Sequence, residues 1–455
     1  MIDALSSVWW LIVALGILVT FHEYGHYWVA RRCGVKVLRF SVGFGKPLWM
    51  RKGKDGTEWV VAAIPLGGYV KMLDERESDV RADELDQAFN RKSVWQRIAV
   101  VVAGPLANLI LCIALFWLMF VIGRPDYAPV IGQTQGISAE SGMRRGDTLL
   151  AIGDRETPTW TEASMALVTS AIDRAQTPIR VRTPEGTVLT RQVDFSKLPK
   201  SNDLMQTLGR IGIIPRHQMQ PAVVGEIVAG SAGDGKLSVG DRIVAIGGTR
   251  VQYWTDISPL VARIGELGGG EIELVRNGAT LTVAVSPKPE RAKGTAADGA
   301  PTWLLGVRAA DTGKAPKDAV LRFGPLAAFP AALRETWFQT GELFAMIQRA
   351  FSGRLAVQNT VSGPIGIAQA ANAYAKNGTA WYLSLLAALS LSLAILNMLP
   401  IPVLDGGHLL YYLIELVKGR PLSERAMAAG QYVGLALLFG LMGLAFYNDL
   451  QRLIQ

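Results

Sequence analysis

The strongest chemical signal in this sequence is a pair of histidines with a glutamate beside them, close to the N-terminus. His22, Glu23 and His26 form an H-E-x-x-H pattern. On an α-helix, positions 22 and 26 lie about 40° apart around the axis, so both imidazoles can reach one metal ion, and Glu23 lies at the edge of the same face. The pattern is typical of zinc-dependent peptidases. Short patterns also arise by chance, and a lone histidine is more often a hydrogen-bonded structural residue.

The apolar surroundings of this motif favour metal binding over chance. Residues 8–30 form an apolar run that can span about 30 Å of hydrocarbon at about 1.5 Å per residue. Ionisable side chains inside a membrane helix are costly, and they mark functional sites. The chain contains four histidines, and two of them belong to this motif. We therefore predict that His22 and His26 bind a zinc ion and that Glu23 transfers protons during hydrolysis.

A second segment offers the third protein ligand that a catalytic zinc ion usually has. Residues 397–408, with the sequence NMLPIPVLDGGH, interrupt a later apolar run with two prolines and two glycines. Broken backbone at membrane depth is tolerated only where protein or a wet cavity surrounds it. Spacing alone leaves Asp405 and His408 as competing ligands. Asp405 also has a structural alternative, as the cap of the following helix.

The composition and the distribution of charge indicate a membrane protein with a large water-exposed part. Of 455 residues, 50% are hydrophobic and 18% are charged, which is too apolar for most soluble proteins. Apolar runs occur at residues 8–30, 97–124, 381–399 and 426–447. Lys and Arg gather after the first run, before the second, and between the third and the fourth, so we predict that these segments are cytoplasmic and that both termini and residues 124–380 lie outside. These flanking cations account for much of the formal net charge of +8, and we predict no nucleic-acid partner.

The segment after the first apolar run has the character of a β region. Two β-rich pieces are separated by G-F-G-K-P at residues 43–47 and followed by L-G-G-Y at residues 66–69, a pattern that predicts hairpins with turns at these glycines. Two interpretations remain open. The region is either a small cytoplasmic sheet or a sheet that dips into the membrane and pairs an extended peptide at its edge.

The long outside segment contains an internal repeat with an offset of 94 residues. Residues 146–153, GDTLLAIG, match residues 240–247, GDRIVAIG, and the pair Trp160-Thr161 matches Trp254-Thr255. The Gly-Asp turn before an apolar strand resembles that of PDZ domains, which bind peptide tails by strand addition. The alternative is that the two domains only block access by their bulk.

The predicted fold class is a polytopic α-helical membrane protein with four transmembrane helices, a membrane-associated β region and two tandem PDZ-like α/β domains outside. Between the PDZ-like pair and the third span, helical spacing of apolar residues predicts amphipathic helices on the outer membrane surface. We expect these helices to anchor the PDZ-like pair, and a gating role is a hypothesis. The predicted boundaries are 1–33 for the first transmembrane helix with the H-E-x-x-H motif, 34–96 for the β region, 97–124 for the second transmembrane helix, 125–220 and 221–310 for the PDZ-like domains, 311–378 for the amphipathic helices, 379–417 for the third transmembrane segment and 424–448 for the fourth transmembrane helix.

Together these motifs resemble the site-2 protease family of intramembrane zinc metalloproteases, in particular its bacterial members with two PDZ domains. Further matching motifs are G-P-L-A-N at residues 104–108, S-G-P-I-G-I-A at residues 362–368 and N-x-x-P-x-P-x-L-D-G from Asn397. The resemblance implies His22, His26 and Asp405 as zinc ligands and Glu23 as the catalytic carboxylate, and it leaves His408 either a supporting role behind the ligands or a structural role. It also implies a substrate-binding region made by Asn397, Gly43, Gly45, Gly67, Gly68 and Tyr69.

The resemblance further implies what such a protease cuts and where. The expected substrate is a single-span membrane protein of the anti-sigma-factor type, already trimmed outside, with signal-peptide remnants as a second class. The expected location is the bacterial inner membrane, with the active site toward the cytoplasmic side and a role in a stress response. Two other functions compete, namely a transporter or ion carrier, because buried ionisable groups also mark permeation paths, and an inactive PDZ scaffold. Glu23 next to the histidine pair favours hydrolysis over both.

Overall fold

The computed structural model describes residues 2–77, 79–198, 209–290, 302–313, 315–352 and 363–454. The chain divides into two compact units. Residues 1–125 and 320–455 form one unit, which we call the membrane unit, and residues 126–319 form the other, which we call the inserted unit. Ser362 of the predicted S-G-P-I-G-I-A motif lies outside the described residues, as do parts of both predicted PDZ-like domains and of the predicted amphipathic segment, at residues 199–208, 291–301 and 353–361.

Within the described part of the membrane unit, four helices are long and apolar enough to cross a bilayer. They are α1 (Ile2–Arg32), α2 (Val94–Ile122), α10 (Thr379–Asn397) and α12 (Glu424–Ile454). These helices confirm the four predicted apolar runs. Helix α2 packs against both α1 and α10, and the three helices share one apolar core to which Leu18, Phe116 and Leu386 contribute. The protein is therefore a polytopic membrane protein in which α2 is a central packing element.

Helices α1 and α2 approach each other closely at the H-E-x-x-H motif. A Cβ atom added at Gly25 of α1 would lie 2.3 Å from the carbonyl oxygen of Ala103 on α2. Only a glycine fits such a contact between two helix backbones. The start of α2 is fixed by a capping box in which Ser93 and Gln96 satisfy each other's backbone amides.

The chain between α10 and α12 is broken and then helical again. Helix α10 ends at Asn397, and α11 (Asp405–Lys418) begins after a short non-helical segment. The two glycines after Asp405 have no room for a side chain. A Cβ atom at Gly406 would lie 2.2 Å from the Leu399 carbonyl oxygen, and one at Gly407 would lie 2.4 Å from that of Ile401. The glycines therefore allow the segment before α11 to fold back against the first turn of this helix.

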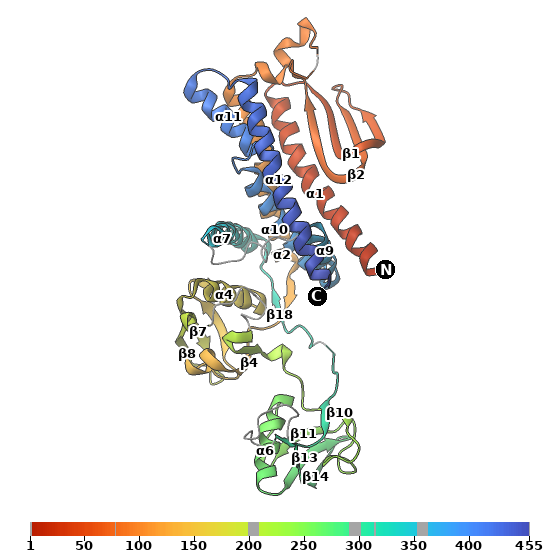
Figure 1. Cartoon of the computed structure of the whole chain (residues 1–455), viewed down its shortest axis with the longest axis vertical. Coiled ribbons are helices and arrows are strands. Elements are labelled where there is room, and N and C mark those ends of the chain that lie inside the picture. Colours follow the sequence, from red (N-terminus) through yellow and green to blue (C-terminus); the bar gives the residue numbers. More distant parts are fainter. Residues whose placement is uncertain are drawn as a thin grey trace. The chain divides into compact units, whose positions relative to one another are not determined.

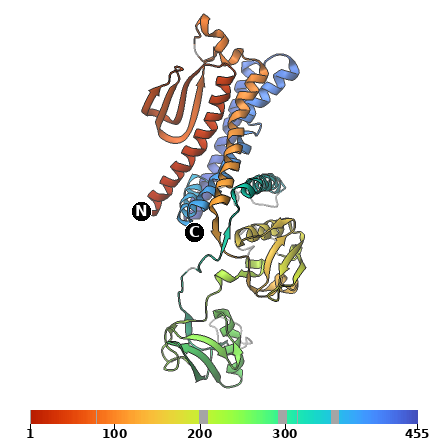
Figure 2. The same cartoon turned by 180° about the vertical axis from the view of Figure 1, so that it is seen from behind.

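The β region is one small sheet made from two long, bent strands. Strands β1 (Val37–Lys52) and β2 (Glu58–Met72) are antiparallel, and the first part of β1 pairs on both sides, since Arg39 lies opposite both Lys71 and Glu58. The spatial order is therefore residues 47–52, 58–62, 37–42 and 68–72. The sheet lies beside the C-terminal half of α1 in both views (Figure 1, Figure 2).

The prediction of turns at the glycine-rich motifs of this region was wrong. Gly43 and Gly45 lie inside β1 and Gly67 lies inside β2, where the pairing register shifts. All three have a positive φ, of 93°, 86° and 143°, in the region that favours glycine. The glycines bend the strands without ending them, so that each strand pairs more than once.

Two further helices, α7 and α9, belong to the membrane unit. Helix α7 (Pro325–Phe351) packs on α2, where the indole Nε1 of Trp117 donates a hydrogen bond of 2.9 Å to the Pro325 carbonyl. Helix α9 (Pro364–Asn377) is capped from another helix, because the Asp449 carboxylate on α12 accepts hydrogen bonds from the backbone amides of Gly363, Ile365 and Gly366. This cap ties the end of α12 to the start of α9.

The inserted unit contains two halves with the same strand order and separate apolar cores. In the described residues, each half has a four-stranded sheet; the first half adds two helices and one pair of short strands, and the second adds one helix and two pairs of short strands. The first half contains β4 (Ile131–Thr134), α3 (Gly136–Glu140), β5 (Thr148–Ile152), β6 (Arg155–Glu156), α4 (Trp160–Asp173), β7 (Gln176–Arg182), β8 (Val188–Asp194) and β9 (Ile213–Pro215), and its sheet has the order β6-β5-β7-β8. The second contains β10 (Val224–Ile227), β11 (Arg242–Ile246), β12 (Thr249–Arg250), α6 (Ile257–Glu266), β13 (Gly270–Arg276), β14 (Ala279–Val285), β15 (Lys288–Glu290), β16 (Thr302–Leu304) and β17 (Val307–Ala309), and its sheet has the order β12-β11-β13-β14. The chain enters through β3 (Arg124–Asp126) and leaves through β18 (Ala319–Leu321), which pair with each other.

The repeated Gly-Asp motif has the same structural role in both halves. Asp147 and Asp241 are buried, with 1% and 0% of their surface exposed. Asp147 accepts a hydrogen bond from the Arg144 amide, and Asp241 accepts one from the Ser238 amide. Each carboxylate therefore closes the turn that leads into the following strand.

Candidate metal centre

Three side chains from the two ends of the sequence converge in the membrane unit. His22 and His26 come from α1, and Asp405 comes from the first turn of α11. The Oδ2 atom of Asp405 lies 3.1 Å from His22 Nε2 and 3.5 Å from His26 Nε2, and the two Nε2 atoms are 3.2 Å apart. The structure therefore brings Asp405 to the histidine pair, and His408 is not part of this group in the described chain.

Helix α2 provides the surface against which the two histidines pack. A Cβ atom at Gly104 would lie 2.3 Å from His26 Nε2 and 2.8 Å from His22 Cε1. Any side chain at this position would displace the imidazoles. Gly104 opens the G-P-L-A-N motif, and the motif alone does not predict this role.

The hydrogen bonding of His26 determines which ring nitrogen faces the group. Its Nδ1 atom lies 2.8 Å from the carbonyl oxygen of Val100. A carbonyl only accepts hydrogen bonds, so Nδ1 carries the proton and the lone pair of Nε2 points to Asp405. This is the tautomer that a metal ligand needs.

The donor set and its hydrogen bonding fit a zinc ion. Asp405 Oδ2 is buried without a hydrogen-bond partner among the described residues. Acceptor atoms so close together repel one another unless a cation or a proton lies between them. Two imidazole nitrogens and one carboxylate oxygen form a ligand set of catalytic zinc sites, in which the fourth position stays open.

A cavity of about 1440 Å³ gives access to this group. Its wall includes Glu23, Asn397 and the segment Gly67–Met72 of β2. Gly68 brings this strand close to the motif, because a Cβ atom there would lie 3.1 Å from Glu23 Cγ. The base candidate, the predicted ligands and one edge of the sheet therefore border the same space.

Comparison with known proteins identifies the family. The model of Peptidase family M50 matches residues 10–441. The chain is 50% identical to a Xylella fastidiosa protein named "Putative zinc metalloprotease", over 98% of this chain and 99% of that protein. It is 40% identical to the Escherichia coli protein named "Regulator of sigma-E protease RseP", over 99% of this chain and all of that protein, and 39% identical to "Protease RseP" of Yersinia pestis over the full length of both.

The chain belongs to peptidase family M50. This M50 peptidase is a zinc metalloprotease of the site-2 type, and its described residues include four helices that could span a membrane. The predictions of the family, of the enzyme class and of zinc are therefore confirmed.

Not every residue predicted for substrate binding lies at the cavity of the peptidase. Asn397, Gly67, Gly68 and Tyr69 line it, as does Phe44, which lies between the two predicted glycines of β1. Gly43 and Gly45 are not among its lining residues. They bend β1 and thereby place the Phe44 ring parallel to the Tyr69 ring, with centroids 6.2 Å apart.

His408 lines the same cavity, although it does not join the three converging groups. Spacing alone had left Asp405 and His408 as candidates for the third ligand. Among the described residues, the structure places Asp405 with the two histidines, and His408 lies outside this group.

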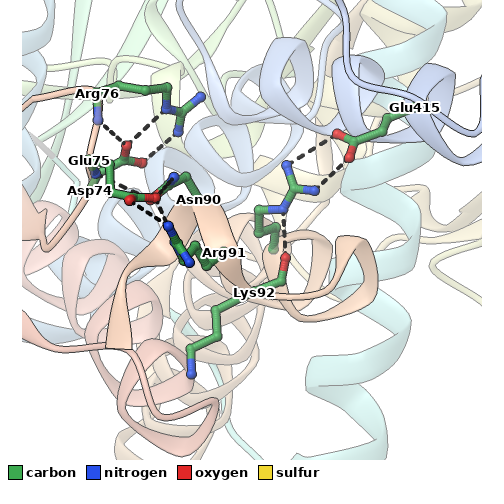
Figure 3. A network of polar contacts seen from close by, with 8 residues as sticks. Asp74, Glu75, Arg76, Asn90, Arg91, Lys92 and Glu415 are labelled. Carbon is green, nitrogen blue, oxygen red and sulfur yellow. Dashed lines mark hydrogen bonds and ion pairs between the residues drawn. The ribbon is translucent and has the colours of Figure 1, made fainter. Parts of the chain in front are cut away.

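A largely buried ion pair holds the far end of α11. Two hydrogen bonds, of 2.7 and 3.1 Å, join the Arg97 guanidinium at the start of α2 to the Glu415 carboxylate on α11. Arg97 also donates to the Lys92 carbonyl, and its guanidinium lies 4.8 Å from the centre of the Tyr412 ring. Figure 3 shows the contacts of Glu415 and Lys92. Since Asp405 begins α11, this pair helps to fix where the carboxylate lies relative to α2.

The loop before α2 contributes charged groups to the rim of the cavity. Asp74 and Arg76 line the cavity and are paired, with the Arg76 Nε 2.9 Å from an Asp74 oxygen. Beside them, hydrogen bonds from Arg91 and then Asn90 lower the pKa of Glu75 to about 2. Figure 3 shows these neighbouring networks. Which of these charges face the cavity could not be predicted from the sequence, because it depends on the fold.

Proposed function

We propose that this M50 peptidase hydrolyses a peptide bond within the transmembrane segment of a single-span membrane protein. His22, His26 and Asp405 hold the zinc ion, and the convergence of their three ligand atoms, all within 4.8 Å of one another, carries the proposal. When bound, zinc supplies Lewis acidity and lowers the pKa of water from 15.7 to about 7. Glu23 takes the proton of the attacking water and returns it to the leaving amine.

We propose that the substrate is held as an extended strand along β2. A helical segment must unwind before it is cut, because its carbonyls are engaged in hydrogen bonds within the helix. Residues 68–72 pair with β1 on one side only, and among the described residues no strand pairs with their other edge. This edge belongs to the cavity wall that also contains Glu23 and Asn397. Strand addition there satisfies the unwound substrate backbone next to the reacting groups.

We propose that both termini and the inserted unit are periplasmic and that the metal centre lies toward the cytoplasmic side. Arg31 and Arg32 follow the motif at the end of α1, and Lys418 and Arg420 lie between α11 and α12. Basic residues flanking membrane spans favour the cytoplasmic side.

The halves of the inserted unit are proposed to be PDZ-like domains, at residues 125–220 and 221–310. Their shared strand order and their buried Gly-Asp aspartates support this assignment. We propose that the pair restricts which substrates are cut, and peptide capture in the grooves is the competing role. Two relatives are named for the RseP protease, one of them as a regulator of sigma-E, so the proposed substrate is an anti-sigma-factor-type protein already trimmed outside.

The test is cleavage of a single-span substrate by the purified full-length protein. Wild type is expected to cut the trimmed substrate within its membrane segment, and Glu23→Gln is expected to lose about 10²- to 10⁴-fold in rate because the general base is gone. The zinc content of Glu23→Gln is expected to equal that of wild type, because Glu23 is not a ligand. Full activity of Glu23→Gln, or cuts only outside the membrane segment, would contradict the proposal.

A further inference from the structure

Asn108 on α2 is buried at the back of the metal centre. Its surface is 0% exposed, and its side-chain Nδ2 lies 3.2 Å from Nδ1 of His22. Its Oδ1 is buried without a hydrogen-bond partner among the described residues. Its backbone carbonyl accepts a hydrogen bond of 2.7 Å from the hydroxyl of Ser390 on α10. The carboxamide is therefore held in an apolar environment with His22 as its polar neighbour.

The two orientations of this carboxamide have opposite consequences for His22. With Nδ2 toward the ring, the amide donates to Nδ1, the neutral imidazole carries its proton on Nε2, and the Asn108 oxygen stays without a partner. With Oδ1 toward the ring, Nδ1–H donates to the amide oxygen and the lone pair of Nε2 points to Asp405. The oxygen and nitrogen ends of a carboxamide have the same shape, so both orientations fit the same space. Each orientation leaves one end of the carboxamide without a partner among the described residues. What favours the second orientation is His22, because only there does the lone pair of Nε2 point to Asp405 and His26.

We propose that Asn108 is a positioning residue that holds His22 as the Nδ1–H tautomer, with Nε2 free for the metal. The inference rests on the proposed role of His22 as a zinc ligand. The two histidines then have partners of different kinds. The backbone carbonyl of Val100 sets the tautomer of His26. The side chain of Asn108 sets the tautomer of His22, so a substitution at Asn108 can remove this partner.

The spacing of the G-P-L-A-N motif agrees with this role. Gly104 and Asn108 are four residues apart on α2, so they lie one above the other on the same face. Gly104 leaves room for the two rings, and Asn108 orients one of them. Partners of this kind, placed behind a metal-binding histidine, fix the direction of its ring and raise its basicity.

The experiment measures zinc affinity by competition with a chelator, using the full-length protein with Glu23→Gln as the parent so that no hydrolysis occurs. Asn108→Leu is expected to weaken zinc binding about 10- to 100-fold. Asn108→Asp keeps an oxygen that accepts from Nδ1–H, and it is expected to bind zinc close to the parent affinity. Cys112→Ala, one turn along α2 and also 0% exposed, is the packing control and is expected to match the parent.

Nitrogen chemical shifts of ¹⁵N-labelled histidines add a readout that packing alone does not move. The chain has four histidines, so their signals can be assigned by substitution. In the zinc-free parent, His22 is expected to show the Nδ1–H tautomer, and in Asn108→Leu this preference is expected to be lost. Equal loss of affinity in Asn108→Leu and Asn108→Asp, or an unchanged His22 tautomer in Asn108→Leu, would overturn the inference.

The variant His22→Ala separates this inference from the proposal on which it rests. If His22→Ala keeps the parent zinc affinity, His22 is not a ligand and the proposed metal centre is wrong. If His22→Ala loses zinc while Asn108→Leu keeps it, the role of Asn108 alone is refuted.

Discussion

The proposed metal centre and the inserted unit of this peptidase are built in opposite ways. The proposed metal centre joins α1 and α11, which are almost the whole sequence apart, and α2 packs behind them. Each half of the inserted unit is built mainly from one stretch of chain around its own apolar core. Individual polar contacts therefore determine the geometry of the first region, whereas apolar burial determines the fold of the second. We expect substitutions in the metal centre to change metal binding and chemistry. We expect substitutions in the inserted unit to change stability or substrate choice.

Among the tests of this difference, removal of the inserted unit is expected to have the largest effect. Deletion of about residues 127–308, with the flanking segments joined by a flexible linker, is expected to leave one zinc ion per chain. The same deletion is expected to allow cutting of an untrimmed substrate that wild type rejects. Zinc analysis and cleavage of both substrates measure these outcomes. Loss of zinc would show that the two regions are not independent, and unchanged rejection would place the filter elsewhere. Loss of all cleavage in a metal-loaded protein would favour peptide capture by the pair.

The Arg97–Glu415 pair tests how far the metal centre depends on distant polar contacts. Arg97→Ala leaves Glu415 without its partner in a site where only 13% of its side chain is exposed. Breaking such a pair typically costs about 3–5 kcal/mol, and it is expected to loosen α11 and weaken zinc binding. Thermal unfolding and chelator competition measure the two effects. The double variant Arg97→Leu with Glu415→Leu is expected to be more stable than Arg97→Ala. If Arg97→Ala has wild-type stability and zinc affinity, α11 is held by other contacts.

Asp241 gives the corresponding test in the inserted unit. It accepts hydrogen bonds from the Ser238 amide and from Arg276, so Asp241→Ala leaves donors without a partner, at a cost of about 1–3 kcal/mol. Hydrogen exchange is expected to show faster opening of β11 and β13, with unchanged zinc content. Glu266→Ala, at an exposed position of α6, is the control and is expected to change neither. A loss of zinc in Asp241→Ala would contradict the separation of the two regions.

The smallest expected effect concerns acid stability. The hydrogen bond from Arg276 holds the pKa of Asp241 below its ordinary value of 3.8. A carboxyl whose pKa is lower in the folded state contributes stability above its ordinary pKa, and this contribution is lost as the pH falls through the folded pKa. Arg276→Ala raises the folded pKa, so the second half is expected to be less stable near neutral pH, by an amount that shrinks as the pH falls below the ordinary pKa. This difference in the stability of the second half is measured by denaturant unfolding of the full chain, monitored by hydrogen exchange at several pH values. A difference from wild type that does not change with pH would refute the linkage.

The sequence predicted those parts of the molecule that depend on local patterns. Length and apolar character predict four membrane helices, and the spacing of His22 and His26 places both on one face of a helix. The third ligand was ambiguous between Asp405 and His408 until the resemblance was used, because the choice depends on how the broken segment folds back. The glycines Gly43 and Gly67 were predicted to form turns, but they bend strands. A glycine with positive φ occurs in turns and in bent strands alike, so the sequence does not distinguish the two.

Contacts between remote segments could not be predicted. Arg97 and Glu415 lie 318 positions apart, and nothing in the sequence around either indicates the other. Asn108 was quoted within a motif, but its contact with His22 depends on the close packing of α1 on α2 at Gly25 and Gly104. Contacts of this kind join segments that no pattern along the chain connects.

The most direct test of the central claim is the zinc content of two purified variants, Asp405→Ala and His408→Ala. The account predicts that Asp405→Ala contains no stoichiometric zinc, because it loses one of three protein ligands, and that His408→Ala keeps about one zinc ion per chain. Glu23→Gln, measured alongside, is expected to keep its zinc as well. Full zinc in Asp405→Ala together with its loss in His408→Ala would contradict the account and transfer the third ligand to His408.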